Sequence, residues 1–307
     1  MAGSSSVQKV QNGLSDVSLN GGSKWGDQMS SKSSSSDGGS VRGGDKNKKF
    51  RKNNSSNGGD KNKKFTKNTY IEVFDKSKST HHYYNVYFYK EKTIKTTVTH
   101  TASKVDQWIN NVYNAKHDKL DNLIVGLDIE WRRMRNYQSK RNKVAVLQLC
   151  VGRHCLIFQF SCCDAIPESL HDFLGNEKFI FVGSGIQSDA YKLLVDYNLR
   201  VARTEELGSL AAYELTETEE DCAESPFHGA GLKELTREIL KKELPKKRGT
   251  QWSDWQKNFL RDEQVEYACL DAFVSFRLGM RLLNRGNPVH TENNDKDPSQ
   301  PEEVEEE

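Results

Sequence analysis

The sequence predicts an α/β domain built on a mixed β-sheet, in which an antiparallel meander and parallel strands are flanked by helices. Two observations predict this class. Three apolar segments at 123–131, 143–151 and 154–160 follow one another with short connections, which is typical of an antiparallel meander. From about 167 to 215, amphipathic helical segments alternate with short apolar segments, which is typical of parallel strands joined by helices.

The folded domain is predicted to cover residues 69–291 of the 307-residue chain. Residues 1–68 are rich in Ser, Gly, Asn and Lys and carry 13 basic and 5 acidic residues, while residues 292–307 hold eight carboxylates against Lys296. Neither end has enough apolar side chains to form a core. We therefore expect a disordered basic tail and a disordered acidic tail.

The basic tail contains a duplication, because residues 43–50 recur at 58–65. Clusters of Lys and Arg suit a nucleic-acid tether or a nuclear import signal, although a solvated flexible tail is the alternative reading. No segment approaches the roughly 20 apolar residues of a membrane-spanning helix, and the N-terminus lacks the apolar part of a secretory signal. We expect an intracellular protein without a membrane segment, and the nucleus is favoured over the cytoplasm.

The first elements of the domain are predicted from residue 69 onward. Residues 69–100 alternate aromatic and β-branched side chains with polar ones, which predicts strands. A helix should follow, with Thr101 or Ser103 near its N-cap. Its apolar stripe is formed by Val105, Trp108, Ile109 and Val112.

The remaining elements follow the meander in order. Helices are expected near 167–174, 188–197 and 205–215, with strands at 179–183 and near 199–203. Another helix is expected around 232–240, and a last long helix at 262–284.

Two carboxylates interrupt the most apolar of these strands. Asp128 and Glu130 lie in the segment Leu-Ile-Val-Gly-Leu-Asp-Ile-Glu-Trp, where a buried charge is costly unless it is compensated. Because side chains alternate along a strand, both carboxylates point to one face and Ile129 points to the other. The pair can therefore share a cation.

Two further places carry acidic residues in a similar setting. Asp189 follows a buried strand and a glycine-containing turn, which places it in the first turn of a helix. Tyr267 and Asp271 are four residues apart in the last helix, so they project from the same face.

These three motifs, in this order, resemble those of the DEDDy 3′-to-5′ exonucleases of the ribonuclease H-like superfamily. The surrounding residues, including the segments 144–150 and 189–194, are most similar to the exonuclease domain of the Werner syndrome protein and its single-domain plant relatives. A sister class has His five residues before the last Asp, but this chain has Glu266 there. The resemblance covers about residues 100–285 and implies a ribonuclease H-like fold.

The resemblance also implies a two-metal-ion hydrolysis of phosphodiesters at DNA or RNA 3′ ends, which releases nucleoside 5′-monophosphates. An all-oxygen ligand set suits Mg²⁺ or Mn²⁺. Asp128 would bridge both ions, Glu130 and Asp271 would complete one shell, and Asp189 would hold the second ion through water. Tyr267 would orient the attacking water, since its ordinary pKa near 10 makes it a poor base.

Each of these residues also has a structural reading. Asp189 can cap a helix, Tyr267 can pack in the core, and Asp271 can pair with Arg277 or Lys192. The alternative to the enzyme is a catalytically silent module that binds nucleic acid or protein on the same fold. Four converging carboxylates favour the enzyme, because without metal they would repel phosphate.

A basic connection, residues 131–143, follows the Asp-x-Glu strand and contains no acidic residue. Its candidate nucleic-acid contacts are Trp131, Arg132, Arg133, Arg135, Lys140, Arg141 and Lys143. These side chains contact phosphates of the substrate or form an ordinary solvated hairpin, and Trp131 stacks on a base or fills the core. A second basic stretch lies at 241–248, and Trp252 and Trp255 are expected to pack that loop onto the domain.

Overall fold

The computed structural model describes residues 68–89, 92–116, 120–132, 142–216, 218–245 and 249–284. All of them belong to the second of two compact units, Asn62–Glu307. Residues 1–67 of the predicted basic tail, the whole predicted acidic tail and the domain boundary predicted at residue 291 lie outside the described residues. The N-terminal duplication lies outside them as well.

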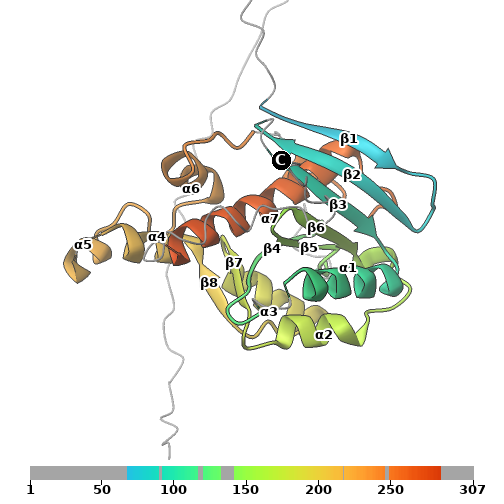
Figure 1. The fold of residues 1–307 in the computed structure, drawn as a ribbon, viewed down its shortest axis with the longest axis horizontal. Coiled ribbons are helices and arrows are strands. Elements are labelled where there is room, and N and C mark those ends of the chain that lie inside the picture. The colour runs from blue at the N-terminus through green and yellow to red at the C-terminus, as the bar shows by residue number, and fades with distance from the viewer. Residues whose placement is uncertain are drawn as a thin grey trace, which may run out of the picture. The chain divides into compact units, whose positions relative to one another are not determined.

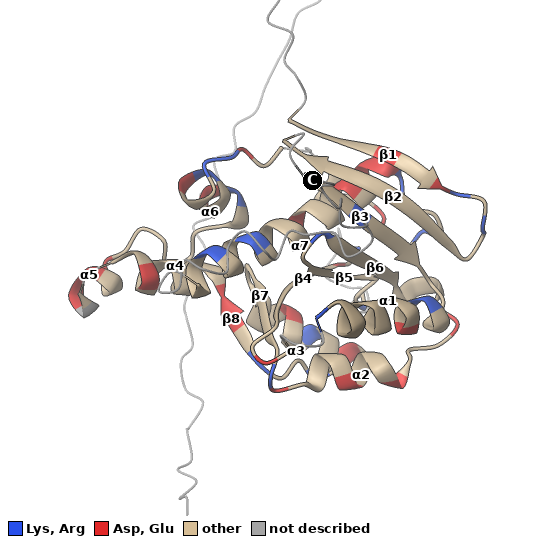
Figure 2. Cartoon of the chain, viewed as in Figure 1, with Lys and Arg blue, Asp and Glu red and all other residues tan. Residues whose placement is uncertain are grey.

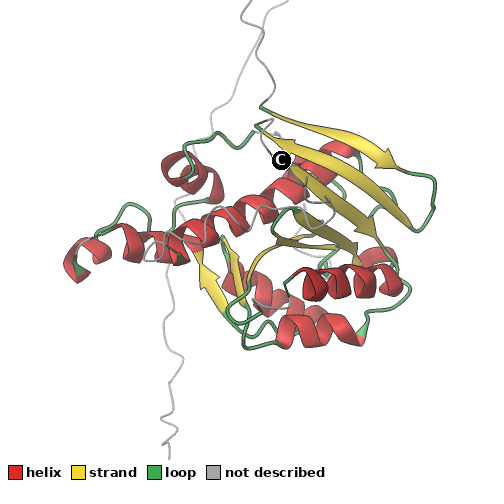
Figure 3. Ribbon diagram, in the orientation of Figure 1, coloured by secondary structure: helices red, strands yellow, loops and turns green. Residues whose placement is uncertain are grey.

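The described part of the chain contains eight strands and seven α-helices, shown in Figures 1 and 3. The strands are β1 (Thr69–Asp75), β2 (His81–Phe88), β3 (Lys92–Thr99), β4 (Ile124–Glu130), β5 (Val146–Val151), β6 (His154–Gln159), β7 (Ile180–Gly183) and β8 (Thr204–Glu206). The helices are α1 (Ala102–Ala115), α2 (Glu168–Gly175), α3 (Ile186–Tyr197), α4 (Leu207–Leu215), α5 (Glu219–Ala223), α6 (Leu232–Ile239) and α7 (Asp262–Leu283).

All eight strands form one sheet in the order β1-β2-β3-β6-β5-β4-β7-β8. The predicted meander is confirmed, because β4, β5 and β6 pair antiparallel. β7 and β8 extend it in parallel from β4. This run of five strands is the ribonuclease H-like mixed sheet that the sequence predicts. The hairpins β1-β2 and β2-β3 join the same sheet because β3 pairs in parallel with β6.

The sheet separates two apolar layers. One layer lies between the sheet and α1, α2 and α3, and it takes Val125, Leu127 and Ile129 from β4. The other layer lies under α7, the long helix that crosses the sheet in Figure 1, and it takes Ile124 from the same strand. This alternation confirms that Asp128 and Glu130 face α7 while Ile129 faces the opposite layer.

Helix α7 approaches the sheet very closely because β4 has a glycine beneath it. A Cβ at Gly126 would lie only 2.0 Å from the carbonyl oxygen of Ala272, which belongs to the helix. Ala272 directly follows Asp271. The close approach therefore sets how near the polar side chains of α7 lie to those of β4.

The largest difference from the expected elements concerns the strand after α3. The sequence predicts it near 199–203, but it forms at 204–206, where β8 pairs with residues 181–183 of β7. Leu199 is instead fully buried in the turn that leaves α3, where Asn198 adopts a left-handed conformation. The apolar character that favours a strand at 199–203 reflects this core packing.

Candidate active site

Three carboxylates meet where β4 faces α7. Asp128 is partly exposed, Glu130 is 8% exposed and Asp271 is 9% exposed. Each offers one oxygen, and these three oxygens all lie within 4.8 Å of one another. Like charges at this separation repel, and carboxylate oxygens are the donors that Mg²⁺ and Mn²⁺ prefer. The donor set therefore fits a divalent cation.

Helix α7 supplies the tyrosine of the site one turn before Asp271. Tyr267 is half-buried and makes a side-chain hydrogen bond with Asp271. Its ring lies 6.2 Å from that of Trp255, which is fully buried. Figure 2 shows that the acidic residues of α7 lie in its N-terminal half and the basic ones in its C-terminal half. This arrangement complements the helix dipole and places the carboxylates at the same end of the helix as Tyr267.

Asp189 lies on α3 and interacts electrostatically with Asp128, but it is not one of the three residues whose oxygens lie within 4.8 Å of one another. The helix begins at Ile186 after Gly185, whose φ of 79° suits glycine. The backbone N–H groups of Gly185 and Ile186 donate to the Glu206 carboxylate at 2.8 and 3.1 Å. Glu206 therefore satisfies the helix N-terminus, and Asp189 does not act as the cap. The prediction that Asp189 lies in the first turn of the helix is confirmed.

The charges of these groups are strongly coupled. Burial raises the pKa of Asp128 to about 7. Burial, followed by the charges of Asp128 and Glu206, raises the pKa of Asp189 to about 8. Burial and the charge of Asp128 also raise the pKa of Asp271 well above its ordinary value. The charge of Asp128 therefore acts on the carboxylates of both Asp189 and Asp271.

The pKa of Tyr267 is also raised, first by burial and then by the charge of Asp271. The phenol therefore stays protonated at neutral pH. This protonation rules out a phenolate base in the metal-free protein and leaves the hydroxyl free to orient a water molecule.

Glu266, the residue that stands where the sister class has His, has a structural role. It is 6% exposed and its carboxylate accepts a hydrogen bond of 2.8 Å from the Thr69 hydroxyl. The contact ties β1 to α7. Glu266 therefore fastens the first strand of the domain to the helix of the site.

The basic connection is described only at its ends. Trp131, Arg132 and Lys143 are described, whereas Arg133, Arg135, Lys140 and Arg141 lie outside the described residues. Arg132 and Lys143 are exposed. Trp131 is half-buried and packs against the layer under α1 to α3, which supports its core reading.

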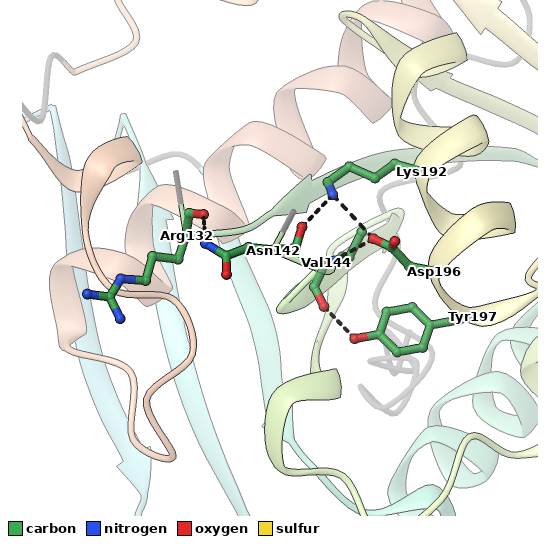
Figure 4. A network of polar contacts seen from close by, with 6 residues as sticks. All are labelled: Arg132, Asn142, Val144, Lys192, Asp196 and Tyr197. Carbon is green, nitrogen blue, oxygen red and sulfur yellow. Dashed lines mark hydrogen bonds and ion pairs between the residues drawn. The ribbon is translucent and has the colours of Figure 1, made fainter. Parts of the chain in front are cut away.

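A polar network joins both ends of the basic connection to α3 (Figure 4). The Lys192 ammonium donates to the carbonyl oxygen of Asn142 at 2.9 Å and pairs with Asp196 at 3.2 Å. It also lies 5.0 Å above the ring of Trp131. The Asn142 amide donates to the Arg132 carbonyl oxygen at 2.7 Å, which closes the connection at its base. The helix that carries Asp189 therefore also holds the basic connection.

The same network continues at Val144. Its N–H donates to Asp196 at 2.9 Å, and its carbonyl oxygen accepts from the Tyr197 hydroxyl at 2.6 Å. Lys192 thus pairs with Asp196, one helical turn away, rather than with Asp271 as the structural reading of Asp271 proposes. Both charges are buried, so removing one of them would leave the other buried without compensation.

Sequence reasoning missed three residues around the site. Glu206 holds the N-terminus of α3, and Lys192 holds the basic connection. Gln148 lies directly opposite Asp128 in the β4-β5 ladder and therefore on the same face. It is fully buried, and neither atom of its amide has a partner among the described residues. A glutamine within an apolar strand was the available signal.

The tryptophans after the second basic stretch differ from expectation in one case. Trp255 is fully buried, as expected, but Trp252 is 60% exposed. Trp252 lies in a short 3₁₀ turn that follows Gly249, and this turn directs the ring outward. Only Trp255 packs into the domain. Of the basic stretch, residues 246–248 lie outside the described residues.

The chain is similar to known proteins of one family. A family model described as 3′-5′ exonuclease matches residues 96–287. The chain is 32% identical over 168 residues to the bifunctional 3′-5′ exonuclease/ATP-dependent helicase WRN of Mus musculus. The matched region covers 54% of this chain and 11% of the mouse protein. It is 30% identical over 181 residues to a 3′-5′ exonuclease of Arabidopsis thaliana, covering 58% of this chain and 60% of that protein.

Two solved structures are also similar to part of the chain. RNase D of Escherichia coli, an exoribonuclease, superposes with a TM-score of 0.48 at 17% identity over 61% of this chain and 44% of that chain. The EXD2 exonuclease domain superposes with a TM-score of 0.35 at 26% identity over 62% of this chain and 90% of that chain. Within the described residues, no helix is long and apolar enough to cross a membrane.

Proposed function

Because the chain belongs to the 3′-5′ exonuclease family, we propose that it removes nucleotides from the 3′ end of a nucleic acid at the cluster of Asp128, Glu130, Asp189 and Asp271. The chain spans 11% of the length of the mouse relative and 60% of that of the Arabidopsis relative, so the activity is inferred from this domain. The observation that carries the proposal is the meeting of three carboxylate oxygens within 4.8 Å beside a tyrosine hydroxyl.

The cluster is proposed to hold two Mg²⁺ or Mn²⁺ ions. Asp128, Glu130 and Asp271 would hold one ion, and Asp189 together with Asp128 would hold the other. The electrostatic coupling of Asp128 to both Asp189 and Asp271 supports this assignment. When bound, the ions neutralise charge that develops on the phosphate and lower the pKa of a bound water.

The residues of the chain then have defined tasks. The Tyr267 hydroxyl, held by Asp271, orients the water that attacks the phosphorus of the terminal phosphodiester. The bond from phosphorus to the 3′ oxygen of the preceding nucleotide breaks, and that oxygen leaves with a proton. The terminal nucleotide departs as a nucleoside 5′-monophosphate. Gly126 keeps α7 close enough to β4 for Asp271 and Asp128 to act together.

The basic connection is proposed to contact phosphates of the strand that enters the site. Its described ends are held by Lys192 of α3, the helix that carries Asp189, and by the hydrogen bond between Asn142 and Arg132. Replacing Arg133, Arg135 and Arg141 by Ala should lower the salt dependence of binding to a single strand. The log-log slope should fall by about 0.7 for each phosphate that these arginines neutralise in the wild type.

A matched control for this variant replaces three exposed arginines elsewhere in the domain, Arg200, Arg203 and Arg237. The control should keep the salt slope of the wild type. Equal slopes for both triple variants would show that the basic connection is a solvated hairpin.

The proposed activity is tested with oligonucleotides labelled at either end. The wild type should shorten a 5′-labelled strand stepwise and release a labelled mononucleotide at once from a 3′-labelled strand. Asp128→Asn should abolish both while it retains binding, and Asp172→Asn, an exposed carboxylate on α2, should change neither. A wild type that binds the strand but leaves it intact in Mg²⁺ and Mn²⁺ would instead identify a silent binding module.

A further inference from the structure

A buried amide lies beside the carboxylate cluster, in the layer under α7. Gln148 on β5 pairs directly with Asp128 on β4, so the two side chains stand on the same face of the sheet with Cβ atoms about 4.5–5.5 Å apart. Helix α7, which carries Asp271, packs on both strands (Figure 1). Gln148 is fully buried. Its amide therefore lies within one side-chain length of the Asp128 carboxylate.

Asp128 is the acceptor that directly flanks Gln148 on this face. On the other side, Gln148 pairs with Ile157 of β6, which is buried and apolar. Along its own strand the next residues on this face are Val146 and Cys150, a valine and a thiol, neither of which is a strong hydrogen-bond acceptor. Of these four flanking positions, only Asp128 carries a carboxylate. The amide of Gln148 is therefore best placed to donate to Asp128.

Gln148 differs from the two other glutamines that are buried in the described part of the chain. Gln159 on β6 donates to two backbone carbonyl oxygens of residues 257–258 at 3.0 and 3.3 Å, and Gln264 on α7 donates to the Ser253 hydroxyl oxygen at 2.9 Å. Neither atom of the Gln148 amide has a hydrogen-bond partner among the described residues. An unpaired buried amide is costly, and an acceptor that moves into reach would remove the cost.

The Asp128 carboxylate has room for an amide donor. Its side chain accepts a hydrogen bond from the backbone N–H of Ile129. A carboxylate has about four acceptor positions, so this N–H and two cations leave one of them for the Gln148 amide. An amide is uncharged, so it can orient the carboxylate without repelling a cation. Hydrogen bonds of this kind hold metal-binding carboxylates in the orientation that suits the ion.

We propose that Gln148 is a positioning residue of the active site, whose amide N–H donates to the Asp128 carboxylate when that carboxylate holds a divalent cation. The proposal rests on the proposed function for the presence of a cation at Asp128. The metal-free protein bears the cost of the unpaired amide, and the bound state removes that cost. The difference adds to the affinity of the site for its cation.

Mn²⁺ binding to Gln148→Met tests the proposal. Methionine has nearly the length of glutamine and suits a buried position, but it has no N–H to donate. Isothermal titration calorimetry is done on metal-free protein without nucleic acid. The Kd for Mn²⁺ should rise about 10–100-fold above that of the wild type, which is the typical loss when the partner of a metal ligand is removed. An unchanged Kd would overturn the proposal.

Urea unfolding in chelator separates this role from an ordinary structural one. Gln148→Met should resist urea at least as well as the wild type, because it removes an unpaired amide and breaks no hydrogen bond of the metal-free protein. The matched control is Gln159→Met, a buried glutamine on the same face whose amide is paired. The control should unfold at a lower urea concentration and keep the wild-type Kd for Mn²⁺. Equal loss of urea resistance in the two variants, or an equal rise of Kd, would contradict the proposal.

A second substitution guards against a defect specific to methionine. Gln148→Leu introduces the residue type found at positions 147 and 149, and it should give the same rise in Kd. Failure of both variants to fold would overturn the proposal, because removal of an unpaired amide should not destabilise the domain.

Cleavage then connects Gln148 with the reaction. At low Mn²⁺ the single-turnover rate of Gln148→Met should fall about 10–100-fold, and saturating Mn²⁺ should restore most of it. Normal cleavage with equal Kd values in the variant and the wild type would overturn the role of Gln148 alone. A wild type that binds Mn²⁺ more tightly than Gln148→Met but does not cleave would overturn the proposed function and leave the role of Gln148 in metal binding supported.

Discussion

Replacing Asp128 by Asn should stabilise the metal-free protein, and the gain should depend on pH. The burial that raises the pKa of Asp128 to about 7 makes its ionised form unfavourable in the folded protein. The unfolded chain titrates near 3.8, so the folded protein holds an extra proton between about pH 4 and pH 7. Unfolding releases that proton, and stability therefore falls as the pH rises through this window. Asn carries no charge, so the variant does not lose this stability as the pH rises.

The size of the effect follows from the same two values. The difference between 3.8 and about 7 corresponds to at most about 4 kcal/mol, since one pKa unit is about 1.4 kcal/mol. At pH 8 the Asn variant should exceed the wild type by up to that amount. At pH 5 most of the difference should vanish. Removal of the Asp128 charge also removes its repulsion of Asp189 and Asp271, which adds to the gain in stability at high pH.

The assay is urea unfolding in chelator from pH 5 to pH 8.5, with Asp172→Asn as the control. Mg²⁺ or Mn²⁺ should reverse the order, because an ion that binds only the folded wild type stabilises it by mass action. A free-energy difference between Asp128→Asn and the wild type that is the same at every pH would refute the reasoning. It would mean that Asp128 is already ionised and compensated in the folded protein.

Three substitutions test other parts of the site. Tyr267→Phe keeps the ring and should lower single-turnover cleavage about 10²-fold with little change in substrate affinity, whereas wild-type rates would remove Tyr267 from the reaction. Gly126→Ala places a Cβ 2.0 Å from the Ala272 carbonyl oxygen. It should lower the free energy of unfolding in urea by at least about 3 kcal/mol and abolish cleavage. A stable, active variant would show that α7 can move away from β4 freely. Lys192→Met leaves the buried Asp196 without its ammonium and should cost about 3 kcal/mol. Adding Asp196→Asn removes the charge, keeps an acceptor for the Val144 N–H and should restore much of that loss, whereas full additivity of the two changes would deny their coupling.

Much of the site was predictable because its residues lie in regular elements. The alternation of a strand places Asp128 and Glu130 on one face, and the helical repeat brings Tyr267 and Asp271 together. That the three motifs meet at one site was inferred from the family resemblance. Local periodicity alone does not say that β4, α3 and α7 meet, because that requires the sheet order.

The contacts that support the site were not predictable in the same way. Glu206 caps α3 from the following strand, and Lys192 holds the basic connection through the Asn142 carbonyl oxygen. Both are contacts between side chains and backbone that are distant in the sequence, so no local pattern reports them. The register of β4 with β5, which places Gln148 opposite Asp128, is equally a property of the sheet. The position of β8 at 204–206 shows that an apolar segment indicates burial more directly than it indicates a strand.

The most direct test of the metal-dependent mechanism is single-turnover release of the 3′-terminal nucleotide as Mn²⁺ is added to metal-free protein. We expect no release in chelator, and a rate that rises with Mn²⁺ in the wild type but stays at background in Asp128→Asn. The released product should be a nucleoside 5′-monophosphate. Release at the full rate in chelator would disprove the mechanism, because the carboxylates would then have no cation to hold.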